Sequence, residues 1–74
     1  MNTQELIKKH ETCIAILELI ETAKNNIVDH YLTIDRLSGL PGQEKYCSFL
    51  RNKITSLRGA IERLKLRYNK TLND

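Results

Sequence analysis

Apolar residues recur along the first half of the chain at alternating steps of four and three. The positions are Leu6, Cys13, Leu17, Ile20, Ile27, Tyr31 and Ile34, with His10 and Lys24 at the two remaining positions of the series. Such a heptad repeat is typical of a helix that packs against another helix along one line of side chains, which we call its seam. Asn2 and Glu5 fit a capping box at its start. We therefore expect a first helix over residues 3–38.

A second heptad pattern follows and is uninterrupted. It consists of Cys47, Leu50, Ile54, Leu57, Ile61, Leu64 and Tyr68. Between the two patterns, residues 38–41 fit a Schellman-type helix end, in which Gly39 adopts the left-handed conformation and Leu40 folds back on the last turn. Pro41 is then suited to the first position of the next helix. We expect a turn over residues 39–42 and a second helix over residues 43–71.

A linker this short makes the two helices antiparallel neighbours. The pattern predicts a single all-α domain over residues 1–74, an antiparallel, coiled-coil-like hairpin. In the expected register Ile27 meets Ile54, Ile20 meets Ile61, and Lys24 lies opposite Leu57. Cys13 and Cys47 then lie at opposite ends, about 30 Å apart at about 1.5 Å per residue, so we expect no bond between them.

The first helix carries more apolar residues than one neighbouring helix covers. We take a set on both sides of its seam as a candidate partner surface: Ile7, Ile14, Ile16, Leu19, Ala23, Val28 and Leu37. An apolar surface this wide is typical of a helix in a bundle. The favoured interpretation is a homodimer that forms a four-helix bundle. Another protein as partner, or leucines scattered on the surface without a role, remain alternatives.

Charge is divided unevenly between the halves. Residues 1–40 contain four basic and six acidic side chains, net −2, and residues 41–74 contain eight basic and three acidic, net +5, which together give the net charge of +3. Acidic residues such as Glu21 and Asp35 could neutralise the second helix within the fold. The alternative is a nucleic-acid surface on a candidate basic face: Arg51, Arg58, Arg63, Lys65, Arg67 and Lys70. We favour the first interpretation and expect weak, salt-sensitive nucleic-acid binding at most.

Chemically active motifs are few. His10 and Cys13 share a helix face, but two ligands do not make a structural zinc site. The chain contains no glycine-rich phosphate loop, and no cysteine or serine stands beside a base in a pattern that suggests a nucleophile. We therefore expect no enzyme, metal or cofactor. No segment approaches the run of about 18 apolar residues that a membrane helix requires, and residues 1–5 do not begin a signal peptide. We expect a cytoplasmic protein.

The segment Ile61-Glu62-Arg63-Leu64-Lys65-Leu66-Arg67-Tyr68-Asn69-Lys70 resembles the ending of short uncharacterised proteins from bacterial genomes and their mobile elements. This resemblance implies no function. In architecture alone, the expected hairpin is similar to the plasmid ROP protein, which dimerises into a four-helix bundle and binds RNA. The two share no sequence motif, so the similarity concerns the fold only. The sequence therefore favours a non-catalytic interaction or oligomerisation module, with a small nucleic-acid-binding protein as the alternative.

Overall fold

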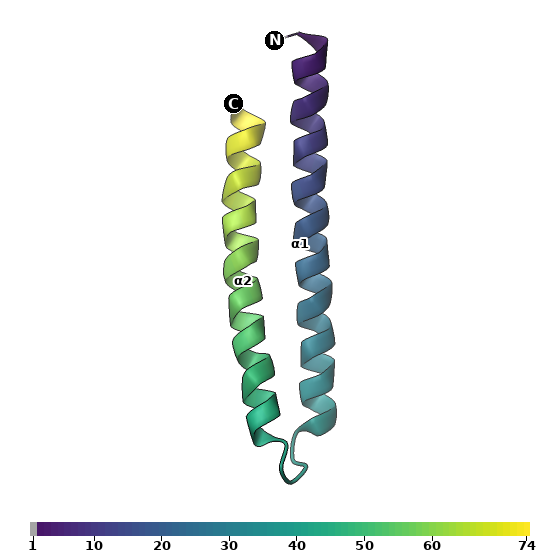
Figure 1. Ribbon diagram of the computed structural model, residues 1–74, viewed down its shortest axis with the longest axis vertical. Coiled ribbons are helices and arrows are strands. Elements are labelled where there is room, and N and C mark those ends of the chain that lie inside the picture. The colour runs from purple at the N-terminus through teal and green to yellow at the C-terminus, as the bar shows by residue number, and fades with distance from the viewer. Residues whose placement is uncertain (1) are drawn as a thin grey trace.

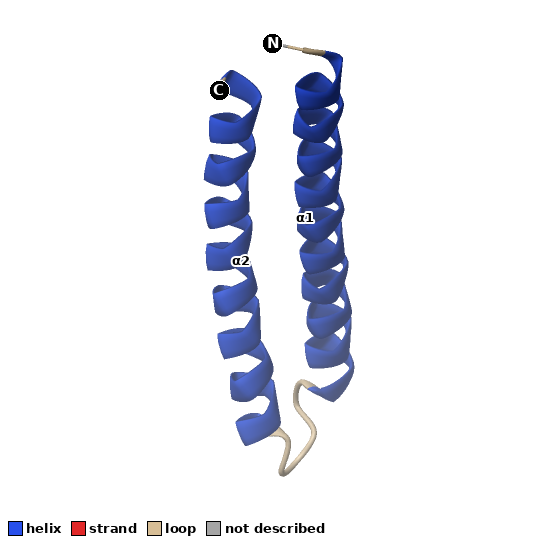
Figure 2. Cartoon of the chain, turned by 45° about the horizontal axis from the view of Figure 1, so that its top comes forward, coloured by secondary structure: helices blue, strands red, loops and turns tan. Residues whose placement is uncertain are grey.

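The computed structural model describes residues 2–74, which form two helices, α1 (Thr3–Leu37) and α2 (Glu44–Asn73). The helices lie side by side and antiparallel, joined by a short linker at one end (Figure 1). The hairpin is slender, with extents of 61 × 15 × 10 Å. A view turned by 45° shows the same two-helix arrangement with no further layer (Figure 2). The all-α hairpin predicted from the sequence is confirmed.

Each helix end satisfies part of its backbone by local hydrogen bonds. At the start of α1, the Asn2 side chain accepts a hydrogen bond from the Glu5 backbone N–H at 2.8 Å. This bond is one half of the predicted capping box. Glu44 lies in the first turn of α2 and Lys70 in its last turn. Their charges oppose the partial charges of the helix ends and stabilise them.

The linker consists of two successive β-turns that share Leu40. The Leu40 N–H donates to the Leu37 carbonyl at 3.1 Å, and the Gln43 N–H donates to the Leu40 carbonyl at 3.4 Å. In each turn the third residue is a glycine with positive φ, 86° at Gly39 and 81° at Gly42. This pattern is that of type II turns, which require a positive φ at the third position.

The two turns correct the prediction for this region. Ser38 has the extended conformation of a type II second position, with φ −61° and ψ 129°, so α1 does not end in a Schellman motif. Pro41 takes the equivalent place in the second turn, where its fixed φ is favourable. Because Gly42 follows it in the left-handed region, Pro41 does not begin the second helix, and α2 starts at Glu44.

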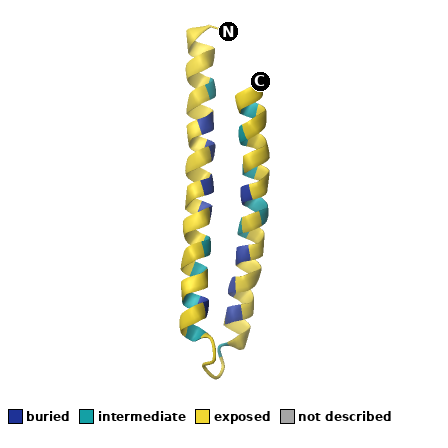
Figure 3. Ribbon diagram, turned by 180° about the vertical axis from the view of Figure 1, so that it is seen from behind, coloured by how far each residue is buried: buried dark blue, intermediate teal, exposed yellow. Residues whose placement is uncertain are grey.

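The seam of α2 agrees with the prediction. Cys47, Leu50, Ile54 and Ile61 are buried, and Leu57, Leu64 and Tyr68 are partly buried and pack against the core. The core forms two connected groups of side chains. Ile16, Ile20 and Ala23 pack with Ile61 in one, Ile34 packs with Leu50 and Ile54 in the other, and Ile27 contacts both. Figure 3 shows these buried positions along the facing sides of the two helices.

The seam of α1 differs from the prediction at every second position. The positions that face α2 are Cys13, Ile16, Ile20, Ala23, Ile27, His30, Ile34 and Leu37, all buried or half-buried. Leu17, Lys24 and Tyr31, which we predicted in the seam, are exposed. The predicted contact of Lys24 with Leu57 is therefore wrong.

The cost of burying Lys24 explains why α1 turns this side toward α2. The predicted seam would have placed the Lys24 ammonium between the helices, at a large desolvation cost. The observed seam has Ala23 there instead, and a methyl group lets the two backbones approach without burying charge. Ile16 replaces Leu17 at little change in apolar area. Avoiding the buried charge therefore decides between two otherwise similar heptad series.

Both cysteines are free thiols and buried, Cys13 toward the open end of the hairpin and Cys47 near the linker. Their places at the two ends of the hairpin are those that the sequence predicted. Neither helix contains a stretch long and apolar enough to span a membrane within residues 2–74.

Candidate interaction surface

An apolar strip runs along the side of α1 next to its seam and faces solvent. Its apolar members are Ile7, Ile14, Leu17, Val28 and Tyr31, each between 41% and 55% exposed. Four polar residues share the same side at the intervening heptad positions: His10, Glu21, Lys24 and Asp35. We call these nine positions together the α1 stripe. They follow one another at steps of three and four, which is the spacing of a second packing seam on the same helix.

The structure divides the partner surface predicted from the sequence. Ile7, Ile14 and Val28 lie in the α1 stripe, but Ile16 and Ala23 are buried against α2 and cannot meet a partner. The prediction is wrong for these two, because the observed seam of α1 contains Ile16 and Ala23 where the expected seam had Leu17 and Lys24.

The other two members of that predicted surface lie elsewhere. Leu19 is exposed on the opposite side of α1, and Leu37 is half-buried beside the linker. Leu17 and Tyr31, which the prediction assigned to the seam, belong to the stripe instead. The signal that could have found them is Lys24, since a charged residue in a series of seam positions argues that the series faces solvent.

Tyr31 connects the stripe to α2. Its hydroxyl accepts a hydrogen bond from the Arg58 guanidinium, which also lies over the Tyr31 ring at 5.6 Å from the centroid. A shallow hollow of about 250 Å³ beside them is also lined by Arg51, Ile54 and Thr55. The stripe therefore borders a basic row on α2, in which Arg51 and Arg58 are followed seven residues later by Lys65.

The basic side chains of α2 are not neutralised by α1. Within residues 2–74 the ion pair joins Lys65 to Glu62 of the same helix, at 3.5 Å. Glu21 and Asp35 form no ion pair with α2, so the favoured electrostatic interpretation of the sequence does not hold in this hairpin. The reason is geometric: both acidic residues lie in the α1 stripe, turned away from the helix contact.

The candidate basic face divides between two sides of α2. Arg51, Arg58 and Lys65 border the α1 stripe, whereas Arg63, Arg67 and Lys70 continue a different series that begins at Tyr46, Phe49 and Lys53. In that series the Tyr46 and Phe49 rings are stacked, with their centroids 6.2 Å apart. The Lys53 ammonium lies 5.3 Å from the Phe49 ring centroid. We call Tyr46, Phe49, Lys53, Arg63, Arg67 and Lys70 the aromatic–basic side of α2.

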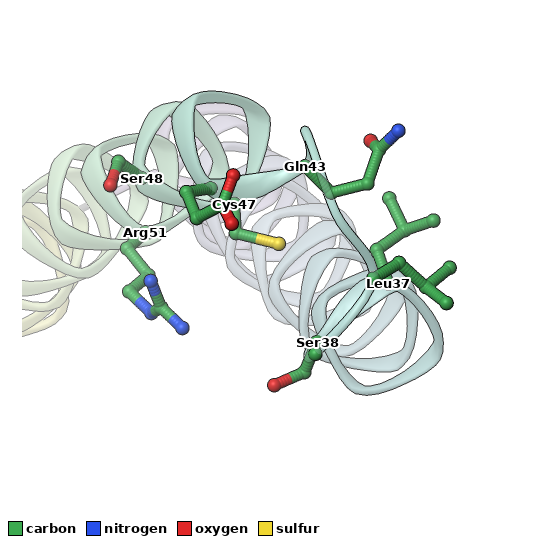
Figure 4. A pocket seen from close by; sticks show the side chains of 9 residues that line it. Leu37, Ser38, Gln43, Cys47, Ser48 and Arg51 are labelled. Carbon is green, nitrogen blue, oxygen red and sulfur yellow. The ribbon is translucent and has the colours of Figure 1, made fainter.

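A pocket of about 170 Å³ lies at the linker, between the end of α1 and the start of α2. Leu37, Ser38, Gln43, Cys47, Ser48 and Arg51 are among its lining residues, and the Cys47 sulfur points into the space between the helix ends (Figure 4). No histidine lines it, and its charged lining residues are Glu44 and Arg51. Within residues 2–74 no group of three or more metal-ligating side chains comes together.

The chain matches no protein-family model, no curated protein and no solved structure. The surfaces of the hairpin are therefore the features that indicate a function.

Proposed function

We propose that this protein is a non-catalytic protein–protein interaction module, which self-associates through the α1 stripe. The observation that supports this most directly is the exposure of five large apolar side chains on one side of one helix, about half of each side chain being in water. We place the protein in the cytoplasm, because both cysteines are free thiols in the fold.

The stripe supplies an apolar driving force for association. Full burial of a large apolar side chain is worth about 1.5–3 kcal/mol, so covering the exposed half of each contributes roughly 1 kcal/mol. Two copies that meet through the middle of the stripe, from Ile14 to Tyr31, cover eight such side chains, four from each. Exposed apolar side chains gathered on one side of a helix mark an interaction site more often than isolated surface leucines do.

The direct test is sedimentation equilibrium of the purified chain at micromolar concentrations, compared with the variants Ile14→Lys and Leu17→Lys. We expect the native chain to have a mass above that of one 8.6 kDa chain. Each lysine variant shifts the mass to that of the monomer, because it places a charge in the contact. Both sites are exposed in the hairpin, so helicity measured by circular dichroism stays unchanged.

Leu19→Lys is the matched control. Leu19 is 53% exposed and lies on the side of α1 opposite to the stripe. The substitution introduces the same charge into the same kind of side chain and should leave the mass of the native assembly unchanged. A native chain that sediments as a folded monomer would remove the basis for self-association.

A second candidate function is nucleic-acid binding through the aromatic–basic side of α2. It is favoured by the stacked Tyr46 and Phe49 rings, which continue into Lys53 and then into three further cations without ion-pair partners within residues 2–74. Exposed rings beside cations are the elements of a single-stranded nucleic-acid surface. The net charge of +3 is modest, so we rank this function below self-association.

Fluorescence anisotropy with single-stranded DNA, duplex DNA and hairpin RNA at ~150 mM salt tests the second candidate. We expect weak binding that fades as salt rises. Submicromolar binding that is lost in Arg67→Glu, but retained in Arg58→Glu on the other side of α2, would place nucleic-acid binding first. Retained helicity of both variants is required.

A further inference from the structure

The order of charges in the α1 stripe defines how two copies fit together. Near its middle the stripe has Glu21 followed by Lys24, and apolar residues lie on both sides of this pair. When two copies of α1 are placed antiparallel about the midpoint of these two residues, Glu21 of each copy faces Lys24 of the other. The same placement sets Leu17 opposite Val28 and Ile14 opposite Tyr31, so that apolar residues meet apolar residues.

The same register also brings together the polar residues near the two ends of the stripe. In this register His10 lies opposite Asp35 of the second copy, a second complementary pair. All four residues are exposed in the hairpin, and none forms an ion pair within residues 2–74. The polar members of the stripe are therefore left without partners by the monomer and gain them from a second copy.

Other arrangements lose this complementarity. In a parallel dimer Glu21 faces Glu21 and Lys24 faces Lys24, which is unfavourable. Shifting the antiparallel pair by one heptad in one direction sets Lys24 against Val28, and in the other direction against Ile14. Each shift buries a charge against an apolar side chain at a desolvation cost. One antiparallel register satisfies the stripe from His10 to Asp35.

The same two-fold axis also fixes which residues of α2 face each other in the two copies. Ala23 and Ile61 belong to the same part of the core, so the middle of the stripe lies alongside residues near 60 of α2. Arg58 and Glu62 lie on either side of that point, one turn apart on the same side of the helix. In a square four-helix bundle built on this axis, Arg58 faces Glu62 of the second copy.

The size of the contact is appropriate for a dimer of moderate affinity. The antiparallel register overlaps residues 8–37 of α1, which span about 45 Å at about 1.5 Å per residue. A helix contact about 10 Å wide then covers roughly 450 Å² per chain, close to the lower limit of about 1,000 Å² in total for specific interfaces. Contacts of this size are typical of weak or transient association.

We propose that a second copy of this chain is the partner of the α1 stripe and that the two α1 helices pair antiparallel, with Glu21 of each copy opposite Lys24 of the other. This inference rests on the proposed self-association and adds its register. In an antiparallel two-fold contact each pair occurs twice, so a single substitution changes two pairs at once.

The test compares the dissociation constants of four chains by sedimentation: the native chain, Glu21→Lys, Lys24→Glu, and the double variant with both substitutions. Each single variant places like charges opposite each other, and we expect it to weaken the dimer about tenfold or more at low salt. The double variant restores opposite charges in the antiparallel register and returns the affinity to the native range. An equimolar mixture of the two single variants forms a heterodimer, because both pairs are then complementary.

Asp29→Lys is the matched control, since Asp29 is exposed on α1 outside the stripe and the change in charge is the same. It should leave the dissociation constant unchanged. A native dimer that is insensitive to Glu21→Lys, or a double variant as weak as the single ones, would overturn this register while leaving self-association in place. A native chain that stays monomeric would overturn both.

Discussion

At the scale of single residues, Ala23 determines how closely α1 and α2 approach. It is 8% exposed and packs in the same part of the core as Ile16, Ile20 and Ile61. The residue that follows, Lys24, points to solvent. A one-residue rotation of α1 would exchange the two side chains, so this position is where the identity of one residue decides which side of a helix is buried.

Replacing Ala23 by leucine should therefore destabilise the hairpin. The added side chain has no space between the helices, and overpacking of this kind costs about 1–3 kcal/mol. Thr22→Leu is the matched control, because Thr22 is exposed, and its effect should stay within about 0.5 kcal/mol. Urea unfolding followed by circular dichroism, at equal protein concentrations, measures both. Equal stabilities for the two variants would contradict the observed seam of α1.

At the scale of elements, the linker and α2 contain glycines with opposite roles. Gly42 has a φ of 81°, and a methyl group added there would meet no atom within 4 Å. The restriction at Gly42 is thus conformational and not steric. Gly59 lies inside α2, and an added methyl group would meet only the end of the Arg63 side chain, at an ordinary 3.4 Å. Nothing within the hairpin requires glycine at that position.

Substitution by alanine should therefore change the free energy of unfolding in opposite directions at the two sites. Gly42→Ala forces a side chain into the left-handed region and lowers the free energy of unfolding by about 1–2 kcal/mol. Gly59→Ala raises it by up to about 1 kcal/mol through helix propensity. Thermal or urea unfolding of both variants checks this. A loss of stability in Gly59→Ala would indicate that another backbone approaches α2 closely at this position.

The two helices also differ in how well the sequence predicted them. On α2 only one heptad series is apolar, so its seam from Cys47 to Tyr68 followed directly from the spacing. On α1 two series share Cys13, Ile20, Ile27 and Ile34, and the spacing does not choose between them. The choice depends on the cost of burying Lys24, and this cost arises only when the two helices pack together.

The linker shows a different reason for a missed prediction. Both the Schellman end and the paired turns use glycine with positive φ, so the composition of residues 38–42 fits either. The two turns are distinguished by hydrogen bonds to Leu37 and Leu40, which place Pro41 before a second left-handed glycine. Local sequence therefore predicted both helix boundaries at the linker to within one residue, but not the conformation of the turns between them.

At the scale of the whole molecule, the hairpin separates its two candidate surfaces. The α1 stripe is apolar with a self-complementary charge pattern, and the aromatic–basic side belongs to a different series of positions on α2. Sequence alone found three of the stripe's five apolar members, because Leu17 and Tyr31 were assigned to the core. It also assigned Glu21 and Asp35 to contacts within the chain, whereas their place in the stripe leaves them for a partner.

Small-angle X-ray scattering with in-line light scattering detects an antiparallel dimer formed through the α1 stripe by its mass and its length. We predict a particle with the mass of two 8.6 kDa chains and a longest dimension close to the 61 Å of one hairpin, because the two copies overlap almost fully. A particle of one chain's mass at concentrations up to hundreds of micromolar, or a dimer much longer than a single hairpin, would contradict this arrangement.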